Sequence, residues 1–231
     1  MARPPKFFAV EEWYHCYSRG IDKRTVFKDA SGYKRFVELL FLANSRKTLH
    51  RSDITHTDHR ALFSLDRDEP LVSIGAYALM PNHFHLLIKE TREAGISSFM
   101  RKLGTAYTMY FNIKYERSGG LFTRPFRARH VADDRYFQHV VSYIHLNPAE
   151  LFERGWKEGI VKHSSALVER LMQYPYTSLP DFNGIPRPER TILGEHIFEV
   201  FRQKTAAQMV REAVAYEENF FSGPNHVKVT P

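Results

Sequence analysis

The stretch of sequence that decides the fold is LVSIGAYALMPNHFHLLIK, which runs from Leu71 to Lys89. It consists of two apolar runs, 71–79 and 83–89, that are joined only by Met80-Pro81-Asn82. A short connection of this kind between runs of β-forming residues is typical of a hairpin. The stretch therefore predicts two antiparallel strands.

The segments on either side of this hairpin predict an interleaved order of strands and helices. Alternating or aromatic runs indicate strands, helical spacing of apolar residues indicates helices, and Gly or Pro marks their ends. The predicted elements are a strand at 12–19, a helix beginning near Tyr33, the hairpin, a helix at 95–117, a basic strand at 125–131 and a helix at 133–147. The order βαββαβα predicts an α+β protein, a ferredoxin-like (RRM-like) antiparallel sheet with helices on one face.

Charge divides the chain into two parts. Residues 1–149 hold 23 Lys and Arg against 15 Asp and Glu, whereas residues 150–231 hold 10 against 11. We expect a basic catalytic domain at 1–149 and a mostly helical C-terminal extension at 150–231, with a polar surface insertion at 48–70. The basic excess favours a polyanionic partner, although a solvated basic surface would have the same composition.

Several classes of protein are disfavoured by what the sequence lacks. It has no apolar run long enough to cross a bilayer and no hydrophobic signal stretch near its start. Its single cysteine, Cys16, cannot form an internal disulfide. The sequence contains neither a glycine-rich phosphate loop nor a Gly-x-Ser-x-Gly motif. We therefore expect a cytoplasmic protein without a membrane partner.

The hairpin carries a candidate metal site. Alternate side chains of a strand face the same side, so His83 and His85 emerge together while Phe84 packs on the other face. Two imidazoles at this spacing can bind one ion. They can also be two hydrogen-bonded histidines at the edge of a sheet, and spacing alone leaves both interpretations open.

The helix at 133–147 carries a candidate nucleophile. Tyr143 lies at the edge of its apolar stripe, and Asn147 follows one turn later on the same face. A phenol beside an amide oxygen suits a metal-assisted tyrosine nucleophile. The alternative is a boundary tyrosine with its hydroxyl in water, followed by an asparagine that ends the helix before Pro148.

A third group of candidates is basic. Arg127 and Arg129 share a face of the predicted strand, Arg124 precedes them, and Arg101 and Lys102 lie on the preceding helix. Guanidinium groups among aromatic rings suit contacts to the phosphates and bases of single-stranded DNA. The alternative is a charged sheet face whose arginines pair with nearby acids.

Five stretches of the sequence resemble stretches of a known family, and they occur in the same order as in that family. Met80-Pro-Asn-His-Phe-His-Leu-Leu-Ile88 and Tyr143-Ile-His-Leu-Asn-Pro148 resemble the signature blocks of the REP-associated tyrosine transposases, relatives of the single-tyrosine insertion-sequence transposases in the HUH endonuclease superfamily. The further similar stretches are Tyr14-His-Cys-Tyr-Ser-Arg-Gly20, Leu121-Phe-Thr-Arg-Pro-Phe-Arg-Ala128 and Tyr174-Pro-Tyr-Thr-Ser178. Three features depart from the family, namely the insertion at 48–70, Pro125 and the last forty residues. These departures put substrate specificity in doubt more than chemistry.

The resemblance implies a function and a role for particular residues. The protein would be a metal-dependent single-stranded DNA endonuclease and strand transferase, cleaving near DNA hairpins through a covalent 5′-phosphotyrosine. Tyr143 would be the nucleophile, and His83, His85 and Asn147 would bind Mg²⁺ or Mn²⁺. The DNA would be a REP-like palindromic hairpin with a single-stranded flank, and the protein would be nucleoid-associated. A monomer is expected, although the family also contains dimers.

Two other functions stay open on the sequence alone. One is a DNA-hairpin-binding protein that keeps the fold but has no catalytic activity. The other is a metal-dependent hydrolase that activates water instead of a tyrosine.

Overall fold

The structure, a computed structural model, describes residues 7–47, 58–202 and 204–221. Its centre is a four-stranded sheet in which every neighbouring pair is antiparallel, with strand order β2-β3-β1-β4. The strands are β1 (Trp13–Arg19), β2 (Val72–Met80), β3 (His83–Glu90) and β4 (Arg127–His130). This is the strand order of a ferredoxin-like fold, so the predicted α+β class, antiparallel sheet and hairpin are confirmed.

Helices connect these strands and make up most of the C-terminal part. The α-helices are α1 (Ala30–Leu42), α2 (His59–Leu62), α3 (Gly95–Lys114), α4 (Asp134–Leu146), α5 (Ser164–Gln173), α6 (Leu179–Phe182), α7 (Ile197–Val200) and α8 (Ala206–Phe221). Short 3₁₀ helices are η1 (Ile21–Lys23), η3 (Asn147–Leu151), η4 (Trp156–Glu158) and η5 (Pro188–Ile192). No helix in the described ranges is long and apolar enough to cross a membrane.

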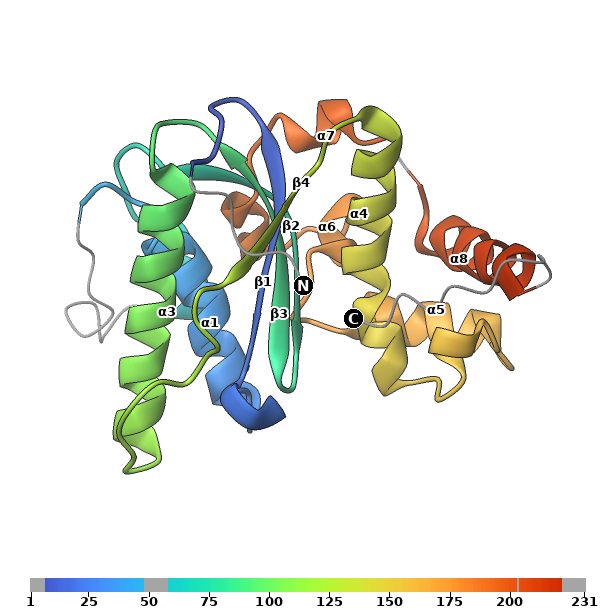
Figure 1. Ribbon diagram of the computed structural model, residues 1–231, viewed down its shortest axis with the longest axis horizontal. Coiled ribbons are helices and arrows are strands. Elements are labelled where there is room, and N and C mark those ends of the chain that lie inside the picture. The colour runs from blue at the N-terminus through green and yellow to red at the C-terminus, as the bar shows by residue number, and fades with distance from the viewer. Residues whose placement is uncertain (1–6, 48–57, 203, 222–231) are drawn as a thin grey trace.

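The helices cover both faces of the sheet rather than one. Figure 1 shows α1 and α3 on one side and α4 on the other. The ring of Phe84 lies 4.9 Å from Phe36 of α1, whereas the neighbouring His85 lies 5.5 Å from Tyr143 of α4. The predicted placement on one face therefore holds for α1 and α3 but not for α4. An amphipathic pattern identifies the buried side of a helix, not which face of the sheet that side covers.

Strand β2 explains how α4 packs against the sheet. Ala76 and Ala78 pair with Leu87 and His85, and their small side chains lie on the face that α4 covers. The register between β2 and β3 shifts at Gly75, where a Cβ atom would come within 2.7 Å of the Trp13 ring. A bulge in an antiparallel pair re-aims the side chains that follow it. The shift thus places two alanines beneath the helix.

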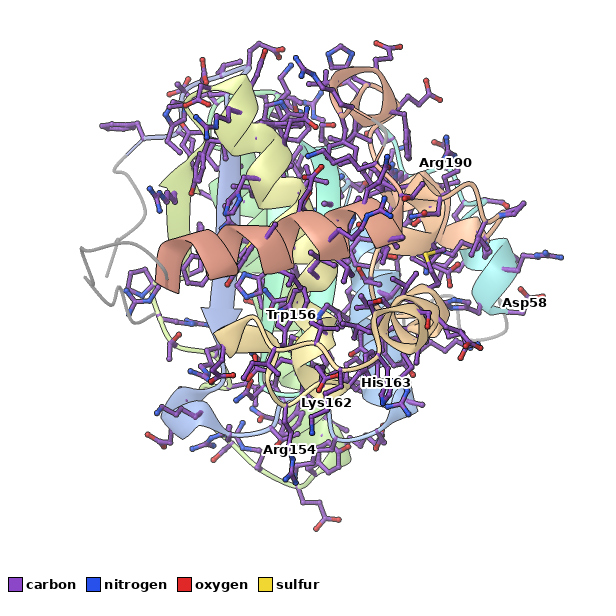
Figure 2. The ribbon with its side chains drawn as sticks, turned by 90° about the vertical axis from the view of Figure 1, so that its right-hand side faces the viewer. Asp58, Arg154, Trp156, Lys162, His163 and Arg190 are labelled. Atoms are coloured by element: carbon purple, nitrogen blue, oxygen red, sulfur yellow. The ribbon has the colours of Figure 1, made fainter. Side chains whose placement is uncertain are left out.

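The outer edge of β2 is covered by the C-terminal part of the chain. The backbone N–H of Leu79 donates to Tyr176, and that of Ser178 donates to Tyr77, both at 3.0 Å. Figure 2 shows α8 running across the outer side of α4, above the segment that carries Trp156 and His163, and α8 contacts α4. The described residues from 150 onward therefore cover the edge of β2 and part of the outer side of α4. The division at 149 stays a prediction.

The predicted insertion at 48–70 falls partly outside the described residues, since 48–57 are not among them. Its later part forms α2, in which Leu62 is buried in the main core, followed by the buried Phe63. This part is therefore attached to the domain and is not a free surface loop.

Arg187 is expected to stabilise the attachment of the C-terminal part. Its guanidinium donates to both carboxylate oxygens of the fully buried Asp181, at 2.9 and 2.5 Å, and to the hydroxyl of Tyr77 at 3.0 Å. Replacing Arg187 with leucine would leave a buried carboxylate without its partner, which costs about 3–5 kcal/mol of unfolding free energy. Urea denaturation measures this loss. The exposed pair Arg46–Glu69 provides the control, since Arg46→Leu should cost less than about 1 kcal/mol; equal losses for the two variants would contradict the prediction.

Candidate active site

The two histidines of β3 lie on the face of the sheet that α4 covers. Phe84 between them points the other way and is buried against Phe36 and Phe122. The rings of His83 and His85 lie 5.0 Å apart and are perpendicular, and the His85 side chain is buried. Strand alternation therefore brings the imidazoles together, as the sequence predicts.

Helix α4 brings Tyr143 to the same place. The helix begins after Asp133, whose carboxylate accepts a hydrogen bond from the Tyr136 backbone N–H at 2.8 Å. Its buried stripe consists of Phe137, Val140, Val141 and Ile144. Tyr143 lies at the edge of that stripe and is 45 % exposed, so it faces His85 with one side and solvent with the other. A phenol in this position can meet a substrate that approaches from outside.

Asn147 completes the predicted group of four. It follows α4 directly, one turn after Tyr143, and begins η3. Its side-chain oxygen lies 3.3 Å from Nε2 of His83. The structure thus gathers His83, His85, Tyr143 and Asn147 on one side of the sheet.

The second ring nitrogen of each histidine has a partner. Nδ1 of His83 lies 2.6 Å from the side-chain oxygen of Asn82, whose amide nitrogen in turn donates to the carbonyl of Lys23 at 3.2 Å. Nδ1 of His85 lies 2.9 Å from Nε2 of His15 on β1. Both histidines are therefore held through Nδ1. Nε2 is then the nitrogen of each ring that could bind a metal ion.

His15 is a member of the site that the sequence prediction missed. It is buried, and its ring lies 5.0 Å from His85 and 5.7 Å from Tyr143. Tyr17, two residues along the strand, stacks on His85 at 5.5 Å. Alternation in β1 groups these side chains on one face, but only the pairing of β1 with β3 reveals which residues they meet.

The buried imidazoles are held in their neutral form. Burial lowers the pKa of His85 well below its ordinary value, and the neighbouring His15 and His83 lower it further. Burial, together with the positive charge of Arg129, lowers the pKa of His15 to about 4. A neutral imidazole keeps a lone pair, which metal binding requires.

The residues present fit a divalent ion. Two ligands at about 2.1 Å from an octahedral ion, at a right angle, lie about 3.0 Å apart, close to the 3.3 Å between the His83 nitrogen and the Asn147 oxygen. Within the described residues, no group of three or more His, Cys, Asp and Glu is arranged to hold a metal. Two imidazoles and one amide oxygen are a different donor set, which Mn²⁺ accepts more readily than Mg²⁺ does.

The predicted basic residues lie on two different sides of the sheet. Arg127 and Arg129 pair with Tyr17 and His15 and share the face of the histidines. The guanidinium of Arg129 lies 4.8 Å over the ring of Tyr136 on α4. Exposed Arg124 lies in the segment just before β4, next to Thr123, whose N–H donates to the carbonyl that ends β1. Arg127 and Arg129 therefore lie on the face of the site, and Arg124 lies on the segment that leads into the same strand.

Arg101 and Lys102 are not brought to this site. Both lie on α3, which covers the opposite face. The ammonium of Lys102 donates to the carbonyls of Ser45 and Lys47, at 2.6 and 3.1 Å. It thus stabilises the residues that follow α1. A role for these two residues in DNA binding would require a second contact surface, and it stays a prediction.

Comparison with solved structures supports this fold. The chain is similar to a structure described as "Structure of the REP associates tyrosine transposase bound to a REP hairpin", with a TM-score of 0.51 and 13% sequence identity. The similarity covers 82% of this chain and 90% of that one. At this identity it shows a shared fold. No curated protein matches the chain.

Comparison with family models identifies the family. The model of IS200-like transposases matches residues 31–147, which is just over half of the chain. The matched residues run from α1 to Asn147 and contain both histidines of β3 and Tyr143. The chain therefore belongs to the IS200-like transposase family.

Proposed function

We propose that this protein is a metal-dependent single-stranded DNA endonuclease and strand transferase that cleaves near DNA hairpins through a covalent 5′-phosphotyrosine. The observation that carries the proposal is the group formed by the half-exposed phenol of Tyr143, the imidazole of His85 and the close pair His83–Asn147. A nucleophile and a set of metal ligands on one face are what a single-tyrosine nuclease needs.

In the proposed reaction, one phosphorus–oxygen bond forms to Tyr143 and another breaks in the DNA. Its phenolic oxygen attacks the phosphorus atom of a DNA phosphodiester and gives up its proton to solvent. The bond to the 3′ oxygen breaks, and that oxygen leaves with a proton from solvent as a 3′-hydroxyl. The 5′ phosphate stays on Tyr143 as an ester, so a second 3′-hydroxyl can reverse the step and join another strand without a nucleotide cofactor.

His83, His85 and Asn147 would hold the ion, which we propose to be Mn²⁺ or Mg²⁺. The bound ion would polarise the scissile phosphate and stabilise the charge that develops during attack. The chain itself contributes the orientation of His83, because the side-chain oxygen of Asn82 lies at its Nδ1 atom. The four residues proposed for the site lie together within one chain, which supports action as a monomer.

The arginines on β4 and just before it support single-stranded DNA as the substrate. Arg124, Arg127 and Arg129 offer charge for phosphates, and the nearby rings of Tyr17 and Tyr136 offer surfaces for bases. The structurally similar transposase is bound to a REP hairpin. We propose a hairpin with a single-stranded flank as the substrate here, with the flank passing over β4 towards Tyr143.

We expect Arg127→Gln to weaken DNA binding and to make that binding less dependent on salt. Loss of one phosphate contact on a single strand should reduce the slope of log affinity against log salt by about 0.7. Titration of a labelled hairpin with a single-stranded flank at several salt concentrations measures this slope. Arg46→Gln removes the same charge at a surface pair with Glu69 and should leave the slope unchanged. An unchanged slope in Arg127→Gln would show that β4 does not contact the DNA backbone.

A denaturing gel tests the function as a whole. The protein is incubated with Mn²⁺ and a hairpin oligonucleotide labelled on the 3′ side of candidate cleavage positions, so that label on the 5′-phosphate fragment stays with the protein. We expect a protein–DNA adduct that survives denaturation. Tight binding without cleavage would instead favour the hairpin-binding protein, and cleavage without an adduct would favour a hydrolase that uses water.

A further inference from the structure

His15 takes no part in the chemistry proposed above and lies before the residues that match the family model. Nevertheless its side chain is buried, with 8% exposure, on the face that carries the site. It pairs across the sheet with Leu87 on one side and Arg129 on the other. A buried polar ring in this position requires a hydrogen-bond partner, and the partner it has is a predicted metal ligand.

The hydrogen bond between His15 and His85 needs one donor and one acceptor. Nε2 of His15 and Nδ1 of His85 are 2.9 Å apart, and a neutral imidazole carries a proton on only one of its nitrogens. If Nε2 of His15 donated, the proton of His85 would lie on its own Nε2 and block that atom. If Nδ1 of His85 donates, Nε2 of His85 keeps a lone pair. Only the second arrangement leaves His85 able to bind an ion through Nε2.

We propose that His15 is a positioning residue, the acceptor that fixes the tautomer and the orientation of His85 for metal binding. The inference rests on the proposed metal site. His15 acts through His85 and not as a further ligand, because its Nε2 atom is engaged with the ring of His85. An acceptor of this kind makes the ligating nitrogen more basic and keeps the ring in place.

The other histidine of the pair shows the same arrangement. Nδ1 of His83 faces the side-chain oxygen of Asn82 at 2.6 Å. The orientation of that amide follows from its nitrogen, which donates to the Lys23 carbonyl. Asn82 comes from the turn of the hairpin, whereas His15 comes from a neighbouring strand. Two unrelated segments thus supply an acceptor to the same atom of the two rings, as a shared role in metal binding would require.

Mn²⁺ binding tests this role directly. Isothermal titration of the intact protein with Mn²⁺ should give an affinity about 10-fold to 100-fold weaker for His15→Phe, which keeps a ring but has no acceptor. His15→Gln offers a carbonyl oxygen in place of Nε2 and should recover most of that loss. In the nuclease assay, His15→Phe should lower the rate of adduct formation at saturating DNA while leaving the KM for the hairpin unchanged. Equal Mn²⁺ affinity in the parent and His15→Phe would overturn the inference.

Two further measurements keep the test decisive. His83→Ala serves as the reference for loss of a ligand, so a parent protein that binds Mn²⁺ no better than His83→Ala would overturn the metal site and the inference together. Binding by the parent that is lost in His83→Ala but kept in His15→Phe would overturn the inference alone. The tautomer of His85 can be determined in the parent protein without any substitution. Long-range ¹H–¹⁵N correlation spectra of the metal-free parent should show the proton of His85 on Nδ1. A proton on Nε2 would contradict the proposal.

Discussion

Replacing Tyr143 with phenylalanine is expected to abolish the protein–DNA adduct and to reduce cleavage by at least about 10³-fold, the scale on which loss of a nucleophile acts. The substitution removes one hydroxyl and keeps the ring that contacts His85 and His15. Because Tyr143 is 45 % exposed, the loss of its hydroxyl should leave stability nearly unchanged. The loss of activity would therefore be a loss of chemistry.

The denaturing gel described above measures this effect, and thermal melting and hairpin affinity are its controls. Both should match the parent, since the arginines and the sheet are unaltered. Tyr110→Phe is the matched variant, because its hydroxyl contacts Ser31 on the far side of the sheet. It should form the adduct at the parental rate. Cleavage that survives in Tyr143→Phe would show that water is the nucleophile, and the proposed covalent mechanism would be wrong.

The local part of the site was predictable because it depends on periodicity. Alternation in a strand is enough to put His83 and His85 on one face, and one helical turn is enough to put Asn147 beside Tyr143. The family resemblance then joined these two pairs, which lie on elements about sixty residues apart. The distance of 3.3 Å between Nε2 of His83 and the side-chain oxygen of Asn147 agrees with that pairing. Their roles in binding and catalysis stay predictions.

What could not be predicted depends on contacts between elements distant in the sequence. The role of His15 requires knowing that β1 lies between β3 and β4 and in which register. The face that α4 covers carries small side chains of β2, a match that the pattern of α4 itself does not reveal. Arg101 and Lys102 were grouped with the arginines of β4 because they lie on the preceding helix, yet the sheet separates them. Sequence patterns specify which side of each element is buried, and only the packing specifies which sides meet.

The second large effect is expected for His83→Ala, which should abolish cleavage and weaken Mn²⁺ binding by more than the 10-fold to 100-fold that loss of an outer hydrogen-bond partner causes. The imidazole supplies the nitrogen that lies 3.3 Å from the Asn147 oxygen, so its removal would leave the proposed set of ligands incomplete. An ion that polarises a phosphate contributes several kcal/mol to catalysis. Each 1.4 kcal/mol corresponds to about a tenfold change in rate, so adduct formation should fall by orders of magnitude.

His130→Ala is the matched control for this prediction. His130 lies on β4 and pairs with Tyr14, whose side chain packs on the α1 and α3 side, so its ring points away from the site and contacts Glu12. That variant should bind Mn²⁺ and form the adduct as the parent does. Hairpin affinity measured without metal should be nearly the same for the parent, His83→Ala and His130→Ala, because the arginines proposed to contact the DNA are unaltered. If His83→Ala lost hairpin affinity and cleavage to the same extent, His83 would be holding the structure of the interface, and its role as a metal ligand would be refuted.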